Sequence, residues 1–382
     1  MTIPGFDLGT WEQSVVFGVD RVHDLGAELE RLGRKRPLVL CSWRRRRSEE
    51  FRHVAGGLGM TPNVFQGAEE HLPRPVIDAA WRAVREHHAD ALVSFGGGST
   101  IDLGKAVGFV AEHGEGALRN PITPTGQPAK GPPPAGSQEL VHVAVPTTYS
   151  GAEATGCFFI SERQEKRRVA GPRVRPDLVV ADPSLTLSLP WKPTGSTGMT
   201  ALAHCVEGLY SPSRAEWSDS LATSAARSIF RLLPVVSRGP KRVRERGELL
   251  CAAYVAGVIS EVAKMSLHHA LCDGLGARTG IPHGLANAIL LPHVMRFNLE
   301  AAQVGLARVA EAIGVGGSAE AADAIEALVA DLGLPKKLRE VGVFEQDLES
   351  VATWAAERRP EALYSPKPVS VTEALAVLRA AW

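Results

Sequence analysis

A run of three glycines followed by a serine is the part of this chain best suited to bind an anion. Gly96–Gly98 follow the apolar residues 91–95 and precede Ser99, with Asp102 three residues further on. Glycine lets a phosphate approach the backbone closely because it has no Cβ, and N–H groups at a helix start attract negative charge. The pattern predicts a strand, a glycine turn and a helix that bind the diphosphate of a cofactor. A tight turn in which Ser99 and Asp102 only cap the helix explains the local residues equally well.

Strand and helix signals alternate through the first half of the chain and must position this turn. Short apolar runs predict strands at 14–18, 37–41, 91–95, 140–145 and 178–181. Helical spacing predicts helices at 22–32, 75–87 and 99–111. Alternating strands and helices indicate a parallel sheet covered on both faces. Ligands of such sheets bind beyond the carboxyl ends of the strands, where the glycines would lie.

The second half of the chain changes in character after Asp182-Pro183, because strand signals stop and alanine-rich helical patterns continue to Trp382. We therefore expect an α/β dinucleotide-binding domain over 1–186 and an all-helical substrate domain over 187–382. The active site is expected in the cleft between the two domains.

A proline-rich segment interrupts the first domain. Residues 112–139 contain six prolines and several glycines. Proline removes backbone donors and blocks regular elements, so the segment is predicted to be a long surface loop or flap. A disordered insertion fits the same composition.

Composition narrows the class of protein. Lys+Arg and Asp+Glu both number 42, which argues against a general nucleic-acid or membrane-surface binder. The five cysteines are scattered without a CxxC pair, as expected for reduced thiols in the cytoplasm. The first residues lack a basic region followed by an apolar core, so we expect no signal peptide. No apolar stretch approaches the ~20 residues that a membrane span needs.

Three longer motifs, one of which contains the glycine turn, resemble those of a known family. GGGSTIDLGKA at 96–106, VPTTYSGAEAT at 145–155 and IPHGLANAILLPHVMRFN at 281–298 resemble the iron-type (group III) alcohol dehydrogenases, which share a fold with dehydroquinate synthase. Within that family, GMTALAHCVEGLYSP at 198–212 and LHHALC at 267–272 are most similar to the maleylacetate reductases. The resemblance covers nearly the whole chain and implies a cytoplasmic homodimer.

The resemblance implies NADPH or NADH as cofactor. Its cofactor-binding residues would be Gly96, Gly97, Gly98, Ser99, Asp102, Lys105, Thr147, Thr148, Ser150 and Ser42. An acidic residue after the second strand would repel a 2′-phosphate. This chain has Ser42, Trp43 and Arg44 there, which favours NADPH, although the basic run 44–47 is also consistent with a solvated turn.

His204, His269 and His283 fall where the family's metal-binding histidines fall. The family's aspartate ligand lies four residues before the first histidine, and this chain has Thr200 there. A neutral hydroxyl is a poor substitute for a carboxylate, so we expect no bound metal. As in the resembling maleylacetate reductases, the imidazoles would then hydrogen-bond a dicarboxylate substrate and donate a proton to it.

Asp273 stands where relatives usually carry a further histidine. It follows His269 by four residues, so the two are predicted to pair on one helix face and raise the imidazole pKa. Alternatively Asp273 returns a carboxylate to a three-histidine metal site, or is a solvated helix residue. Glu207, three residues after His204, is predicted either to hydrogen-bond around the site or to lie on the helix surface.

The expected activity is an NAD(P)H-dependent reduction of the C=C bond of a 4-oxo-2-enedioate to a 3-oxo-dicarboxylate. The catalytic residues would be His204, His269, Asp273 and His283. One alternative is a metal-dependent alcohol dehydrogenase or aldehyde reductase with a metal on the three histidines. Another is a family member that kept the fold but lost redox chemistry, such as a lyase, a cyclase or a binding partner. The expected partner is a small dicarboxylate or carbonyl compound, with no nucleic acid and no membrane.

Overall fold

The computed structural model describes residues 12–118, 139–162, 165–171, 173–239, 241–358 and 364–382. These separate into two compact units, each described by itself. The α/β unit comprises residues 12–148 and 152–188, and the helical unit comprises residues 149–151 and 189–382. The cleft expected between them stays a prediction. Most of the proline-rich segment predicted as a loop, residues 119–138, lies outside the described residues.

The α/β unit is built on a six-stranded parallel sheet, as the sequence predicts. The strand order is β1-β8-β5-β4-β2-β3, and every neighbouring pair is parallel. The strands are β1 (Ser14–Phe17), β2 (Pro37–Leu40), β3 (Asn63–Phe65), β4 (Ala91–Gly96), β5 (Val141–Pro146) and β8 (Leu178–Ala181). The central strands β2, β4, β5 and β8 are buried along their whole length, which explains why they read as continuous apolar runs.

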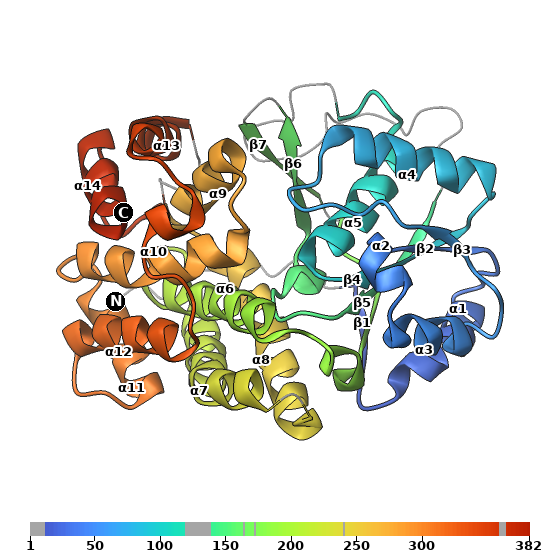
Figure 1. The fold of residues 1–382 in the computed structure, drawn as a ribbon, viewed down its shortest axis with the longest axis horizontal. Helices are drawn as coiled ribbons and strands as arrows, with labels where there is room; N and C mark the ends of the chain where they lie inside the picture. The colour runs from blue at the N-terminus through green and yellow to red at the C-terminus, as the bar shows by residue number, and fades with distance from the viewer. Residues whose placement is uncertain (1–11, 119–138, 163–164, 172, 240, 359–363) are drawn as a thin grey trace. The chain divides into compact units, whose positions relative to one another are not determined.

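Helices cover both faces of this sheet (Figure 1). One face packs against α1 (Leu25–Arg31) and α3 (Glu49–Gly57), and the other against α4 (Arg74–Glu86) and α5 (Gly98–His113). The remaining elements are α2 (Trp43–Arg46), the 3₁₀ turns η1 (Arg21–Asp24), η2 (Ala152–Ala154) and η3 (Pro183–Thr186), and the antiparallel hairpin of β6 (Cys157–Glu162) and β7 (Glu165–Ala170). Strand β3 and the hairpin were not predicted, because neither carries a long apolar run.

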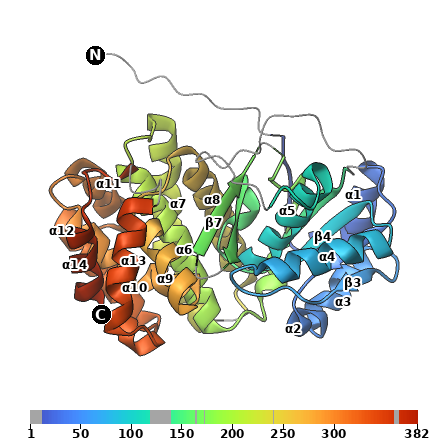
Figure 2. The same ribbon diagram turned by 90° about the horizontal axis from the view of Figure 1, so that it is seen from above.

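The helical unit is entirely helical among its described residues. Its elements are α6 (Trp191–Tyr210), α7 (Glu216–Arg238), α8 (Val243–Val262), α9 (Leu267–Thr279), α10 (His283–Phe297), α11 (Gln303–Ile313), α12 (Ser318–Asp331), η4 (Leu338–Val341), α13 (Glu345–Arg358) and α14 (Val371–Ala381). Helix α6 packs against α7, α8, α10 and α11, and a second apolar cluster joins α9, α10, α13 and α14 (Figure 2).

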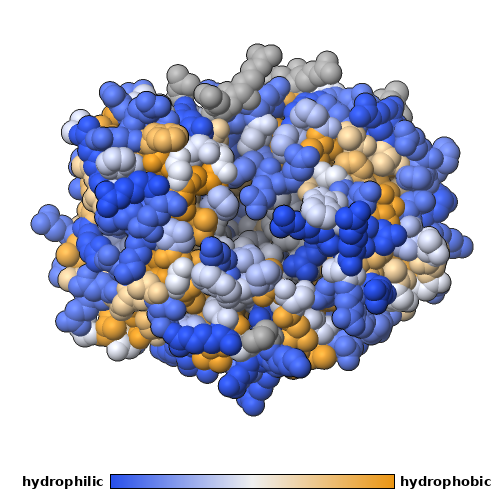
Figure 3. Space-filling model, viewed as in Figure 1, coloured by the Kyte–Doolittle hydropathy of each residue, from blue (hydrophilic) through white to orange (hydrophobic). Residues whose placement is uncertain are grey.

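Within the described ranges no single helix has both the length and the hydropathy to cross a membrane, although α8 and α9, bent by 101° at their junction, meet the criteria together. On the face drawn in Figure 3, hydrophilic residues are interspersed with several separate hydrophobic patches.

A buried lysine fastens the start of the hairpin to helix α5. The Lys105 side chain has no exposed surface, and its Nζ donates to Asp102 Oδ1 at 3.1 Å and to the carbonyls of Ala152 and Cys157 at 2.7 and 2.8 Å. It also donates to Thr155 Oγ1 at 2.8 Å. An ammonium taken out of water must find such acceptors, so this group specifies how η2 and β6 pack on α5.

Replacing Lys105 by methionine is expected to lower the free energy of unfolding by about 2–4 kcal/mol, because the buried acceptors lose their donor. Methionine keeps a similar volume and helix propensity. Urea denaturation measures the change, with the exposed Lys35→Met as control. Equal stability of the two variants would contradict a structural role for this ammonium.

Candidate active site

The glycine turn forms the end of β4 and the start of α5. Helix α5 begins at Gly98, with Gly97 as its N-cap and no side-chain cap. The expectation that Ser99 caps this helix is therefore wrong, since Ser99 already lies inside the first turn. A Cβ on Gly96 would lie 2.4 Å from Thr100 Oγ1, and one on Gly97 would lie 3.0 Å from Thr148 Cγ2. Close packing thus confines both positions to glycine.

The loop after β5 lies beside this turn. Thr147 N donates to the carbonyl of Gly96 at 2.9 Å. Thr147 Oγ1 is buried and has no hydrogen-bond partner among the described residues, and within the helical unit the same is true of Ser150 Oγ. Buried hydroxyls normally have partners, so these two mark positions that a ligand would satisfy. Within the α/β unit, the glycine turn and the unpartnered Thr147 hydroxyl fit a nicotinamide cofactor with its diphosphate at the start of α5.

The other predicted cofactor residues have varied surroundings. Ser42 caps α2, with its Oγ accepting from Arg45 N at 3.3 Å. The Lys105 ammonium has its donors engaged within the protein, which favours a structural role over the predicted cofactor contact, while Asp102 keeps 21% of its side chain exposed. Trp43 is 54% exposed, and the Arg44 guanidinium lies 5.5 Å from its ring centre.

The three predicted histidines meet in the helical unit, although they come from three helices. His204 lies on α6, His269 on α9, and His283 is the first residue of α10. The rings of His204 and His269 stack with centres 4.8 Å apart, and the His283 ring lies 6.1 Å from that of His269. Burial, reinforced by the charge of His269, holds the pKa of His204 well below its ordinary value. His283 is the most accessible, with 31% of its side chain exposed.

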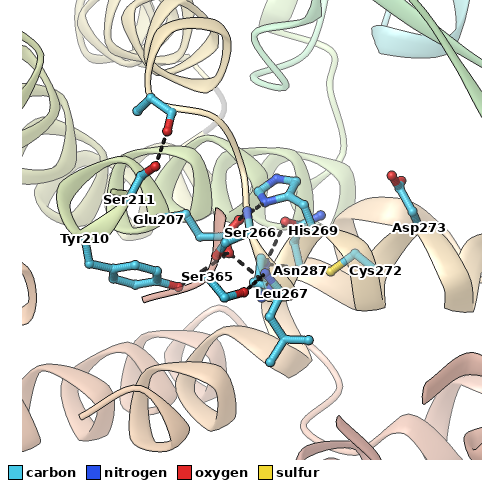
Figure 4. A network of polar contacts seen from close by, with 12 residues as sticks. Glu207, Tyr210, Ser211, Ser266, Leu267, His269, Cys272, Asp273, Asn287 and Ser365 are labelled. Atoms are coloured by element: carbon cyan, nitrogen blue, oxygen red, sulfur yellow. Dashed lines mark hydrogen bonds and ion pairs between the residues drawn. The ribbon is translucent and has the colours of Figure 1, made fainter. Parts of the chain in front are cut away.

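Glu207 supplies the carboxylate partner of His269. Its Oε2 lies 2.5 Å from His269 Nδ1, and its side chain has no exposed surface (Figure 4). Ser266 donates to the same carboxylate through Oγ and, at 3.2 Å, through its backbone N. The backbone N of His268 adds a donor at 3.1 Å. Burial raises the pKa of Glu207, but the hydrogen bond and charge of His269 and the contact with Ser266 outweigh it and lower the pKa to about 2.

Asp273 takes a different position from the one predicted. The i+4 spacing predicted Asp273 as the partner of His269, whereas the structure gives Glu207 that place and puts Asp273 Oδ1 3.8 Å from His283 Nδ1. Asp273 stands apart from the hydrogen-bonded network in Figure 4. The correction has a simple cause, because a sequence rule that compares residues on one helix cannot see a partner on another.

His268 links α9 to the start of α10. Its Nε2 lies 2.9 Å from Asn287 Oδ1, and Asn287 Nδ2 donates to the carbonyl of His283 at 2.9 Å. Since the Asn287 amide donates through its nitrogen, its oxygen accepts, and His268 Nε2 must carry the proton. Burial, with the charge of His269, lowers the pKa of His268 to about 4. His268 was predicted to pack, but its link to His283 through Asn287 has no signal in the sequence.

The donor set around the histidines does not fit a divalent metal. Thr200 Oγ1 donates to the carbonyl of Ser196 at 3.3 Å, so the position of the family's aspartate presents a hydroxyl already bonded within its own helix. The His204 and His269 rings stack with planes that differ by only 15°, so their in-plane lone pairs lie in two separate, nearly parallel planes rather than in planes that meet at one metal position. In the part of the chain that the structure describes, no three His, Cys, Asp or Glu residues form a group able to hold a metal.

Comparisons with known proteins identify the family of this chain. The family model for iron-containing alcohol dehydrogenase matches residues 12–183, and the model for the C-terminal part of the Fe-containing alcohol dehydrogenase family matches residues 194–382. The chain is 38% identical to maleylacetate reductase 2 of Cupriavidus pinatubonensis over 320 residues, which cover 84% of this chain and 81% of that protein.

Solved structures show the same relationship. The crystal structure of maleylacetate reductase from Agrobacterium tumefaciens is 31% identical, with a TM-score of 0.82 and coverage of 100% of this chain and 99% of that one. A 1,3-propanediol oxidoreductase is 29% identical, with a TM-score of 0.88 and coverage of 97% and 98%. The chain therefore belongs to the iron-containing alcohol dehydrogenase family, close to the maleylacetate reductases.

Proposed function

We propose that this protein is an NAD(P)H-dependent reductase of the maleylacetate reductase type, which reduces the C=C bond of a 4-oxo-2-enedioate to give a 3-oxo-dicarboxylate. The observation that carries the proposal is similarity to maleylacetate reductases along nearly the whole chain, at up to 38% identity. The histidine cluster supports it, because three imidazoles without an anionic partner at position 200 suit a dicarboxylate better than a cation.

The chemistry needs a hydride, a proton and a way to hold two carboxylates. When bound, the reduced nicotinamide supplies the hydride that adds to the alkene carbon β to the ketone. The electron pair of the C=C bond then forms an enolate, and its α-carbon takes a proton from the protein. We assign that proton to His283, because it is the most exposed imidazole of the cluster and lies at the N-terminus of α10, where negative charge is favoured. His204 would hydrogen-bond the substrate, and His269 would face it with its unpartnered Nε2.

NADPH is the cofactor that the end of β2 favours. No acidic side chain follows this strand directly. The residues at that position are Ser42, Trp43 and Arg44. Strand β2 pairs with β4, so its carboxyl end lies next to the glycine turn. The exposed Trp43 with the Arg44 guanidinium at its ring would suit an adenine with a 2′-phosphate.

The assignment of the substrate class is tested with a panel of 4-oxo-2-enedioates and short aldehydes, following NADPH oxidation. Turnover of the enedioates is expected, with the 3-oxo-dicarboxylate as product. Turnover of aldehydes alone would favour the alcohol dehydrogenase alternative. We also infer a cytoplasmic homodimer with no nucleic-acid or membrane partner, and the formal net charge of zero supports the last part.

Gly98→Val is expected to weaken NADPH binding at least tenfold, because a branched side chain at the first residue of α5 blocks the backbone from the diphosphate. Gly108→Val is the matched control on the same helix, since a Cβ there meets nothing within 4 Å. Fluorescence titration with NADPH and NADH measures both variants, and wild type should prefer NADPH. Equal affinity of Gly98→Val and Gly108→Val would remove the glycine turn from the cofactor site.

His283→Ala is expected to lower kcat by about 10²–10⁴-fold, the usual loss when a general acid is removed. The dissociation constant for NADPH should change little, because His283 is not among the predicted cofactor residues, most of which belong to the other unit. Steady-state kinetics on the best enedioate and a cofactor titration give the two values. Near-normal turnover would show that another group donates the proton.

Thr200→Asp is expected to raise the affinity for Zn²⁺ or Fe²⁺, because it adds an anionic ligand one turn before His204. The neutral Thr200→Asn has a similar shape and should bind metal as weakly as wild type. Calorimetric titration of chelator-treated protein compares the three. Tight stoichiometric binding by wild type, with activity that depends on the metal, would favour the metal-dependent dehydrogenase.

A further inference from the structure

We propose that Glu207 is the positioning residue of the histidine cluster: it holds His269 with a proton on Nδ1, so that Nε2 is the atom that acts on the ligand. The kinetic part of this inference rests on the proposed function. The structural part rests only on contacts within the helical unit.

The first step concerns the His269 ring. An ionised carboxylate only accepts hydrogen bonds, so a ring nitrogen 2.5 Å from Glu207 Oε2 must carry the proton. In the neutral ring the other nitrogen then carries the lone pair. His269 Nε2 is buried and has no hydrogen-bond partner within the described ranges. The His269 residue is 7% exposed, so this atom is an unsatisfied polar group inside the site.

The second step concerns the helix that carries the ring. The backbone N of Ser266 and the backbone N of His268 both donate to the Glu207 carboxylate, at 3.2 and 3.1 Å. These amides lie at the start of α9, where N–H groups have no partner inside the helix. The Glu207 carboxylate, which α6 carries, thus caps the start of α9. It also orients the ring of His269, which lies in the first turn of α9.

The two tasks divide the carboxylate oxygens between them. Oε2 accepts from His269 Nδ1 and Ser266 N, while Oε1 accepts from Ser266 Oγ and His268 N. A glutamine has one oxygen and one NH₂ group. In either orientation of the amide, the NH₂ group would face N–H or O–H donors from which it cannot accept a hydrogen bond. Glu207→Gln therefore cannot satisfy both tasks, whereas Glu207→Asp keeps two acceptor oxygens on a shorter side chain.

Ser365 provides a matched control at the same helix start. Its Oγ accepts from the backbone N of Leu267 at 3.2 Å, between the two amides that Glu207 caps. Ser365→Ala removes one cap of α9 and leaves the Glu207–His269 contact in place. A loss that arises only from a weakened helix start should appear in both Ser365→Ala and Glu207→Gln.

The kinetic test compares these variants on the best enedioate. Glu207→Gln is expected to lower kcat by about 10–100-fold, the loss usual when the partner of a functional histidine is removed. KM for NADPH should be unchanged, Glu207→Asp should recover part of kcat, and Ser365→Ala should stay near wild type. In a His269→Ala background, Glu207→Gln should cause no further loss. Equal losses in Ser365→Ala and Glu207→Gln, or a full additional loss without His269, would overturn the proposal.

A spectroscopic test does not depend on activity, and its main readout is the tautomer of His269 in the wild-type protein. Nitrogen-15 NMR of histidine-labelled wild-type protein, with His269 assigned from His269→Ala, should show Nδ1 protonated. Glu207→Gln should shift this signal, and Ser365→Ala should not. A dominant Nε2–H tautomer in wild type would refute the positioning role. If wild type is inactive on every enedioate, the proposed function fails while this measurement still decides the role of Glu207.

Discussion

The buried carboxylate of Glu207 is the interaction on which the arrangement of the histidines depends. An anion with no exposed surface is costly to bury unless its oxygens are filled, and here hydrogen bonds from Ser266, His268 and His269 fill them. These donors come from the start of α9, while Tyr210 of α6 adds a longer hydrogen bond at 3.5 Å, so this one group fixes α9 against α6. The stacking of His269 on His204 follows from that packing. The contact of His268 with Asn287 then brings the start of α10 to the same place.

The α/β unit also contains a buried charged side chain, in this case a positive one. Lys105 has no exposed side-chain surface and donates to four oxygens, two of them backbone carbonyls in the chain that leads into β6. Both charges lie within sequence motifs of the family, yet their first effect is to hold backbone segments in place. The predicted site residues lie beside these two charges. The glycine turn begins the helix that carries Lys105, and His269 lies on the helix that Glu207 caps.

Local patterns predicted the elements well and their partners poorly. The apolar runs located β1, β2, β4, β5 and β8 to within about one residue. For β2, β4, β5 and β8 the reason is that buried parallel strands leave continuous apolar sequence. The family motif also predicted that the three histidines come together. Spacing failed for Asp273, since Glu207 and His269 are 62 residues apart in the chain. It also failed for the start of α5, where Gly97 rather than Ser99 is the N-cap.

The remaining misses have the same physical origin. A buried lysine and a solvated lysine look alike in sequence, so the sequence did not show that the Lys105 ammonium has its donors engaged within the protein. Residues 149–151 group with the helical unit although they follow β5 directly, and the sequence showed no sign of it. Tyr149 explains the grouping, because its hydroxyl accepts from the buried Arg246 of α8 at 3.0 Å.

The charge balance of the histidine cluster determines which kind of ligand it favours. A carboxylate strengthens a divalent-metal site, but Thr200 offers a hydroxyl that donates to the Ser196 carbonyl. Glu207 does not compensate, because its oxygens already accept hydrogen bonds from the protein. In the proposed reduction, the N-terminus of α10 would then face a carboxylate of the substrate. Asp273 disfavours an anionic ligand, since its carboxylate lies 3.8 Å from His283 Nδ1 and adds a negative charge. In the proposed reaction, residue 273 would therefore determine how strongly the protein competes with an anionic substrate for His283.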